Sequence, residues 1–367
     1  MLSDLATPVA VVDLDVFGRN VAFGAGRASE LSVGLRPHAK TVKSPDLLAQ
    51  VMEAGAVGLT VSTLGEIRTL ASIATDLLYA VPVAPGRGSH VVDSLGPADV
   101  RLTVTVDSVA AVSAVPSDPR IDVAIEIDCD GHRGGVDPES PTVVEIAERI
   151  AAGHRLRGVM THGGGSYLGS RQDVGRVAGV ERDAVVFAAS RLLDAGHRIE
   201  MVSVGSTPTF VTVDHLDGVT EARPGVYLFG DMSMVELGIF PPDRMALSVL
   251  ATVIGLRAGG STALIDAGWS ALSQDHGVPS LGGRTGIGAV TGPDQNGPVV
   301  RDGLVVSGSN QEHGFVTAPE GGPTGLAIGD RVRVWPNHAC ATAEMHSEFV
   351  TVRGPDIVGT VGRPRGW

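Results

Sequence analysis

The chain has 367 residues, of which 43% are hydrophobic and 19% charged, a composition that excludes a disordered protein. Its net charge of −13 argues against nucleic-acid or anionic-membrane partners, because phosphate backbones and anionic lipids bind a basic face. No run of about 18 uninterrupted apolar residues occurs, and the first residues lack the basic start of a signal peptide. Two cysteines, Cys129 and Cys340, cannot form a disulfide framework, so we expect a cytoplasmic protein.

The first two-thirds of the chain alternates short apolar runs with amphipathic, alanine-rich stretches. Strands are predicted at 9–14, 33–38, 58–62, 77–83, 101–106, 122–128, 156–162, 201–206 and 226–231. Helices are predicted between them at 44–56, 64–73, 141–153 and 183–196. About eight repeats at this spacing predict a parallel α/β architecture, and a (β/α)8 TIM-type barrel is the form that matches the size.

The pattern changes near residue 245. Three later segments, ALSVLATVIGLR, STALIDAG and DRVRVWPNHA, are rich in strand-forming residues, and their connections are rich in glycine. We therefore predict two domains, a β/α barrel at 15–245 and a second, C-terminal all-β domain at 246–367.

The densest cluster of reactive side chains is RPHAKTVK at 36–43. It follows a predicted strand, so Lys40 falls at the strand's C-terminal end, which is the active-site face of a β/α barrel. A lysine crowded by Arg36, His38 and Lys43 can act as an amine nucleophile or Schiff-base former. A solvated basic loop is the commoner explanation of such a cluster taken alone.

Three further strand ends carry polar groups. VGSTPTF (204–210) offers backbone N–H groups, hydroxyls and a helix start, which is typical of a phosphate-binding loop, although an ordinary capped loop is commoner. THGGGSY (161–167) supplies His162 and Tyr167, and ARPGVYLFGD (222–231) supplies Arg223 and Tyr227. In the second domain, WPNHACAT holds His338 and Cys340, whose spacing on an extended segment places both on one face. Imidazole and thiolate suit zinc, and Asp275, His276 and His313 are candidates to complete a site.

Taken together, these segments resemble the fold-type III pyridoxal-phosphate enzymes, the alanine-racemase-like barrel group, and within it the D-serine dehydratase and D-threonine aldolase family. The matching segments occur in family order along almost the whole chain. They are RPHAKTVK, EIDCDGHRGGV, GVMTHGGGSY, VSVGSTPTF, ARPGVYLFGD, IDAGWSALSQDHG, EHGFV and VWPNHACAT. The family motif usually reads RPH-x-KTHK, and here Val42 replaces its second histidine, which leaves the exact substrate open.

The resemblance implies a role for each site residue. Lys40 would form the Schiff base with pyridoxal 5′-phosphate, and His338 and Cys340 would bind a divalent metal, zinc first, with manganese or magnesium as alternatives. The cofactor-binding set would comprise His38, Arg133 at the phenolic oxygen, His162 against the pyridine ring, Tyr167, the phosphate-binding Gly205, Ser206 and Thr207, and either Arg223 or Tyr227 at the pyridine nitrogen. The first strand, within 1–14, would pair with the β domain, and the active site would form between the subunits of a homodimer.

The implied activity is a metal-assisted lyase that acts on a small β-hydroxy D-amino acid. A dehydratase like D-serine dehydratase is favoured, and a D-threonine aldolase is the first alternative. An amino-acid racemase comes next, but no tyrosine beyond residue 245 could serve as the second base. A non-catalytic pyridoxal-phosphate-binding barrel would need no second domain, so it ranks last.

Overall fold

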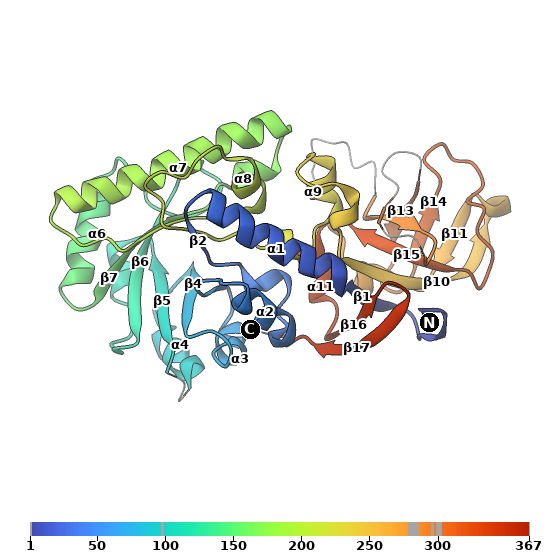
Figure 1. The fold of residues 1–367 in the computed structure, drawn as a ribbon, viewed down its shortest axis with the longest axis horizontal. Coiled ribbons are helices and arrows are strands. Elements are labelled where there is room, and N and C mark those ends of the chain that lie inside the picture. Colours follow the sequence, from blue (N-terminus) through green and yellow to red (C-terminus); the bar gives the residue numbers. More distant parts are fainter. Residues whose placement is uncertain (1, 97–98, 278–285, 295–296, 299–302, 367) are drawn as a thin grey trace. The chain divides into compact units, whose positions relative to one another are not determined.

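A computed structural model describes residues 2–96, 99–277, 286–294, 297–298 and 303–366 (Figure 1). The contacts divide the chain into two compact units. The barrel unit consists of Phe23–Gly225 with Pro364–Trp367, and the β unit consists of Met1–Ala22 with Val226–Arg363. The predicted boundary after residue 245 lies later in the chain than this division, which assigns residues 226–245 to the β unit.

Eight parallel strands form the sheet of the barrel unit, in the order β2-β9-β8-β7-β6-β5-β4-β3. A parallel bridge between His38, just after β2, and Thr60 of β3 joins the two ends of this order and closes the barrel. The predicted TIM-type barrel is confirmed. Its strands are β2 (Gly34–Leu35), β3 (Leu59–Val61), β4 (Asp76–Pro82), β5 (Arg101–Val106), β6 (Ile121–Ile127), β7 (Arg155–Thr161), β8 (Met201–Val204) and β9 (Glu221–Ala222).

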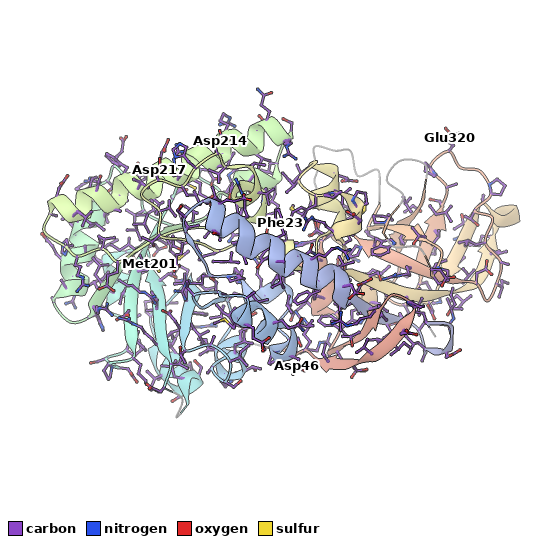
Figure 2. All side chains as sticks on the ribbon, in the orientation of Figure 1. Phe23, Asp46, Met201, Asp214, Asp217 and Glu320 are labelled. Carbon is purple, nitrogen blue, oxygen red and sulfur yellow. The ribbon has the colours of Figure 1, made fainter. Side chains whose placement is uncertain are left out.

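Apolar side chains fill the barrel interior. Met201, labelled in Figure 2, lies in a buried cluster with Leu78, Ala124 and Met160, which come from three other strands. Helices connect the strands: α2 (Pro45–Glu53), α3 (Leu64–Leu70), α4 (Gly88–Leu95), α5 (Val109–Val112), α6 (Thr142–Ala151), α7 (Arg171–Asp194) and α8 (Thr207–Thr212). Short 3₁₀ turns follow β2 and β7, namely η2 (Ala39–Thr41) and η3 (Gly164–Tyr167).

Two sequence predictions in this region need correction. The helix predicted at 183–196 begins at Arg171, where the Ser170 hydroxyl accepts a hydrogen bond from the Asp173 N–H and the Asp173 carboxylate accepts one from the Ser170 N–H. The strand predicted at 226–231 was wrong. The strand is β9, and Val226–Leu228 form a 3₁₀ turn, η4, beyond Pro224 and Gly225. A short, fully buried apolar run does not distinguish a strand from a buried turn by its pattern.

The β unit contains a nine-stranded sheet in the order β11-β14-β13-β12-β15-β10-β1-β16-β17, and an additional pairing of β11 with β10 closes six antiparallel strands into a ring. The chain's first strand, β1, pairs with β10 and with β16, as the resemblance implied. The strands are β1 (Val9–Asp13), β10 (Leu247–Arg257), β11 (Thr262–Ile265), β12 (Gly288–Thr291), β13 (Leu304–Ser309), β14 (Gly314–Thr317), β15 (Arg331–Pro336), β16 (Glu348–Arg353) and β17 (Asp356–Gly362).

Helices of the β unit are short. They are α9 (Met232–Glu236), α10 (Trp269–Leu272) and α11 (Ala339–Glu344), with the 3₁₀ turns η1 (Leu2–Asp4), η5 (Pro242–Arg244) and η6 (Ala258–Gly260). Helix α1 (Leu14–Glu30) runs across the division between the units. The described part of the chain holds no helix with the length and apolar character that a membrane crossing requires.

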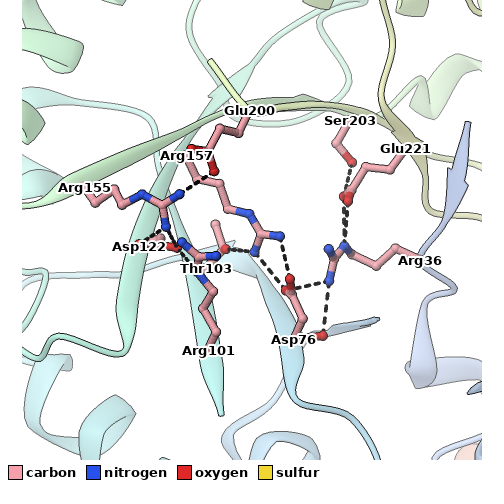
Figure 3. Close-up of polar contacts among 10 residues, drawn as sticks. All are labelled: Arg36, Asp76, Arg101, Thr103, Asp122, Arg155, Arg157, Glu200, Ser203 and Glu221. Atoms are coloured by element: carbon pink, nitrogen blue, oxygen red, sulfur yellow. Dashed lines mark hydrogen bonds and ion pairs between the residues drawn. The ribbon is translucent and has the colours of Figure 1, made fainter. Parts of the chain in front are cut away.

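A network of ion pairs, some of them buried, lies around the N-terminal ends of the barrel strands (Figure 3). Asp76, the first residue of β4, accepts hydrogen bonds from Arg36 at 2.8 Å and from both terminal nitrogens of Arg157 at 2.8 and 2.6 Å. Arg36 also binds the Glu221 carboxylate at 2.9 Å. The side chain of Arg36 is only 1% exposed, so its charge depends on these two carboxylates.

We expect Asp76→Asn to destabilise the fold by about 3–5 kcal/mol, because it leaves two buried guanidinium groups facing a neutral amide. Burial raises the pKa of Asp76, but the hydrogen bonds and charges of Arg157 and Arg36 outweigh it and hold the pKa below its usual value. The stability that ionised Asp76 gives to the folded state is therefore complete above the unfolded pKa of about 3.9. It disappears as the pH falls through the lower pKa of the folded state.

Urea unfolding of both proteins at pH 7, 5 and 3 measures this effect. The difference in unfolding free energy should be equal at pH 7 and 5 and smaller at pH 3. Asp118→Asn, which breaks a pair with the more exposed Arg120, is the matched control and should cost less than about 1 kcal/mol. An Asp76 variant no less stable than this control would contradict the prediction.

Candidate active site

Lys40 lies at the C-terminal rim of the barrel, in the 3₁₀ turn that follows β2. Two backbone hydrogen bonds hold the segment before this turn: the Arg36 N–H donates to the Ala222 carbonyl, and the His38 N–H donates to the Pro224 carbonyl. His38 then caps the turn, because its Nδ1 accepts the Lys40 N–H at 3.4 Å. Val42, at the end of the turn, is fully buried. The structure thus places Lys40 directly after the C-terminal end of β2, and its role there stays a prediction.

His162 follows β7 at the same rim. Its Nδ1 hydrogen-bonds the carbonyl oxygen of Gly205, and its ring centroid lies 6.4 Å from that of Tyr167. A carbonyl oxygen can only accept, so Nδ1 carries the proton and Nε2 is left as an acceptor. Burial, followed by the charges of Arg133, Lys40 and Arg223, lowers the pKa of His162 to about 3. The imidazole is therefore neutral near pH 7.

The loop after β8 runs directly into α8. Ser206 is the N-cap of this helix, and its hydroxyl accepts the Thr209 N–H at 3.1 Å. A Cβ atom on Gly205 would lie 3.1 Å from side-chain atoms of Arg223, so the arginine packs closely against the loop backbone. Arg223 is buried and donates to the Ser203 hydroxyl at 2.6 Å and to the Thr161 carbonyl at 2.5 Å. These bonds fix the guanidinium between the ends of β7 and β8.

The predicted site residues of the barrel unit share one electrostatic environment. Burial, followed by the charges of Lys40, Arg223, His162 and Arg133, lowers the pKa of His38 well below its usual value. Three cationic side chains thus act on two neutral imidazoles at the strand ends. Such a cluster of cationic side chains favours an anionic ligand.

Two buried carboxyl groups at this site were missed by the sequence analysis. Burial raises the pKa of Glu126, on β6, to about 7, and the charges of Arg223 and Arg133 oppose that rise. Glu181, on α7, accepts hydrogen bonds from the Gly163 N–H at 2.6 Å and the Gly205 N–H at 3.1 Å. The capping box of Ser170 and Asp173 could have shown that the helix begins before Glu181, but not which loops Glu181 contacts.

Tyr227 lies in the β unit, in η4, while Arg223 lies in the barrel unit with the other cofactor candidates. The tyrosine side chain is fully buried, and burial raises its pKa. Of the two candidates for the pyridine nitrogen, Arg223 is the one placed beside Gly205 and Thr161.

His338 and Cys340 come together, but not in the way predicted. The extended segment was wrong: His338 is the N-cap of α11, and Cys340 is in the first turn of that helix. The His338 Nδ1 bonds the Asp275 carboxylate at 2.7 Å. Burial alone would lower the pKa of His338, but its hydrogen bonds to Asp275 and Cys340 raise it. Imidazole and thiol are therefore direct neighbours, with a carboxylate behind the imidazole.

Buried Asp231 supports this turn from another element. It caps α9 by accepting the Met234 N–H at 3.0 Å, and it also accepts the N–H of Ala339, the residue between His338 and Cys340, at 3.0 Å. His276 bonds the Gly286 carbonyl at 3.2 Å, and His313 is exposed. Among the residues that the structure describes, no three His, Cys, Asp or Glu side chains are grouped so as to hold a metal ion.

Comparisons with known proteins match both parts of the chain. Residues 12–233 match the family described as "Alanine racemase, N-terminal domain", and residues 246–352 match "Putative serine dehydratase domain". The D-threo-3-hydroxyaspartate dehydratase of Delftia sp. (strain HT23) is 42% identical over 380 residues, covering 100% of this chain and 99% of the relative. The D-serine dehydratase of Dictyostelium discoideum is 29% identical, covering 97% and 96%.

Solved structures agree with these matches. The Delftia dehydratase superposes with a TM-score of 0.93 at 41% identity, covering 100% of this chain and 99% of that one. Two variants of a D-threo-3-hydroxyaspartate dehydratase are also similar: a cysteine-to-alanine variant described as metal-free, and a histidine-to-alanine variant altered two positions earlier. The D-threonine aldolase of Filomicrobium marinum superposes with a TM-score of 0.81 at 27% identity, covering 98% and 95%.

Proposed function

This chain belongs to the pyridoxal-phosphate-dependent lyases of fold type III, and we propose that it dehydrates β-hydroxy D-amino acids to 2-oxo acids and ammonia. The match of 42% identity over the whole length to a D-threo-3-hydroxyaspartate dehydratase carries this proposal. The resemblance stated from the sequence is confirmed, and so is the lyase activity it implied. An aldolase is the second candidate, supported by relatives of lower identity.

The residues at the barrel rim fit pyridoxal phosphate. Lys40 supplies the amine that would bind the aldehyde, and the loop 205–207 would receive the phosphate. The charges of Lys40, Arg133 and Arg223 suit the anionic phosphate and phenolic oxygen of the cofactor, and neutral His162 offers a flat ring surface. When bound, the cofactor acidifies the Cα–H bond of the amino acid.

Within this arrangement, each side chain has a defined task. Lys40 would hold and return a proton at Cα once its amine is displaced by that of the substrate. We assign the pyridine nitrogen to Arg223, which is already fixed by Ser203 and Thr161. We keep His38, Tyr167, Ser206 and Thr207 as cofactor-binding residues, and Tyr227 as the less favoured candidate for the nitrogen.

The residues of α11 fit a divalent metal. Imidazole and thiol are ligands that zinc prefers, and a carboxylate on the second ring nitrogen is the usual way to orient a ligating histidine. Asp275 makes this contact at Nδ1, so Nε2 of His338 and the thiol of Cys340 would be the groups that hold the metal. A metal at this position would act as a Lewis acid toward the β-hydroxyl group. A similar dehydratase is described in a metal-free form as a cysteine-to-alanine variant, which supports a role for a metal in that protein.

Substrates with a β-hydroxyl group distinguish the candidate functions. Purified enzyme is incubated separately with D-threo-3-hydroxyaspartate, D-serine and D-threonine, and products are identified by mass spectrometry. The proposal requires a 2-oxo acid and ammonia from the first or second substrate. Glycine with acetaldehyde from D-threonine would establish the aldolase, and the L-enantiomer as the sole product would establish a racemase.

We also propose a homodimer that acts in the cytoplasm. The dimer follows from the family resemblance, in which the barrel of one subunit and the β domain of the other enclose the active site. The cytoplasmic location is supported by two free cysteines, Cys129 and Cys340. Light scattering coupled to size-exclusion chromatography would test the dimer directly, since a monomer with full activity would exclude a shared site.

A further inference from the structure

Glu181 joins two strand-end loops of the barrel unit. It lies on α7 and is only 2% exposed. One of its oxygens, Oε1, accepts the N–H of Gly163, in the loop after β7, and the N–H of Gly205, in the loop after β8. Both loops carry residues that we place at the cofactor, so a single carboxylate sets their spacing.

The contact with Gly205 also reaches His162. Gly205 uses both backbone polar groups, its N–H toward Glu181 and its carbonyl toward Nδ1 of His162. His162 itself precedes Gly163, which binds the same carboxylate oxygen. The four residues therefore form a closed ring of covalent and hydrogen bonds. This ring holds the Gly205 carbonyl where it selects the Nδ1-protonated form of the imidazole.

A row of hydroxyl groups gives Glu181 a second route to the phosphate loop. Its carboxylate accepts a hydrogen bond from the Thr209 side chain. The Thr209 hydroxyl lies 2.7 Å from that of Ser206, which lies 3.0 Å from that of Ser166. The Thr209 hydroxyl also lies 3.3 Å from the carbonyl oxygen of Ser206. Glu181 is therefore linked to the Ser206 hydroxyl through a single side chain, that of Thr209.

We infer that Glu181 is a positioning residue that fixes the phosphate loop and the tautomer of His162 together. The inference rests on the proposed function, which places the cofactor between these loops. Burying a carboxyl group costs free energy unless hydrogen bonds compensate. Here two of its hydrogen-bond partners, Gly163 and Gly205, belong to the two loops, and the third, Thr209, lies in the first turn of α8, directly after the second loop. Helix α7 itself packs through apolar residues such as Val177, Val185 and Ala188.

Glu181→Ala and Glu181→Gln test this role. Alanine removes the acceptor, so the dissociation constant for pyridoxal phosphate should rise at least about tenfold. The visible circular dichroism of the bound cofactor should weaken, because the ring is held less firmly. Glutamine keeps one acceptor oxygen and should restore the affinity to within about threefold. Thr209→Val removes only the hydroxyl that links Glu181 to Ser206. Its dissociation constant for pyridoxal phosphate should lie between those of the alanine and glutamine variants, and this variant carries the test if Glu181→Ala does not fold.

Asp122→Asn is the matched control. This carboxylate is also buried and binds Arg101 and Arg155, but at the opposite ends of the strands. It should lower stability and leave the cofactor affinity and circular dichroism as in the wild type. If Glu181→Ala had the cofactor affinity and circular dichroism of this control, the inference about Glu181 would be wrong, but the proposed function would stand. A wild-type protein that binds no pyridoxal phosphate would overturn the proposed function as well.

Discussion

Borohydride reduction of the purified enzyme with pyridoxal phosphate should attach the pyridoxyl group to Lys40, and Lys40→Ala should lower turnover by at least roughly a thousandfold. Lys40 is the lysine in the turn at the barrel rim, where its charge acts on His38 and His162. Removing it deletes both the amine that binds the cofactor and the group that moves the Cα proton. Peptide mapping by mass spectrometry locates the label.

Lys43 is the natural control for this prediction. It lies three residues further along the same motif, but its Nζ is 3.4 Å from the Glu66 carboxylate, and both side chains are buried. An amine paired with a buried carboxylate is held away from other partners, so Lys43 is poorly placed to attack the aldehyde of the cofactor. Lys43→Met should therefore lose stability but keep the label on Lys40. A label on Lys43 of the wild type would reject our alignment of the motif.

The barrel could be predicted because each of its longer strands is an apolar run followed by an amphipathic helix. Strands β2 and β9, which lie at one end of the strand order, are harder to predict from sequence. They contain only two residues each, and they form because they pair with neighbouring strands. The run 226–231 was misassigned for the same reason. Its residues are as apolar as a buried strand, and only the fold shows that the ladder ends at Ala222.

The side chains at the barrel rim were found through their motifs, whereas the groups that support them were not. Glu181 lies two residues before the predicted helix 183–196, so it had no assigned face or neighbour. Its partners, Gly163 and Gly205, are distant in sequence and meet only because β7 and β8 are adjacent. A backbone N–H leaves no trace in the residue pattern, so such a carboxylate cannot be assigned from sequence alone.

The metal candidates show a different limit. The pair His338 and Cys340 was identified by residue type, and Asp275 was named as a candidate partner, but the local conformation was wrong. An i, i+2 spacing shares a face on a strand, yet here one residue caps a helix and the other lies in the first turn of that helix. The helix-forming run Ala339–Glu344 was the signal that could have indicated this geometry.

Cys340→Ala should remove the bound metal and lower lyase turnover by at least about a hundredfold, while pyridoxal phosphate stays attached to Lys40. The thiol is one of only two metal ligands we assign, and a β-hydroxyl group leaves poorly unless a Lewis acid stabilises the developing charge on its oxygen. Lys40 and the phosphate loop belong to the barrel unit and Cys340 to the β unit, so the substitution removes none of the groups that we assign to the cofactor. Metal content by mass spectrometry and the visible absorbance of the cofactor measure the two effects separately.

Cys129→Ala is the matched control, since it removes the other cysteine of the chain. Burial raises the pKa of Cys129 to about 12, so its thiol stays protonated and is a poor metal ligand. This variant should keep both the metal and the activity. Treatment of the wild type with a chelator should reproduce the Cys340→Ala result, and added zinc or manganese should reverse it. If the chelated, metal-free enzyme dehydrated a β-hydroxy D-amino acid at the full rate, the thiol would only fill space beside His338, and a metal-free lyase would replace our proposal.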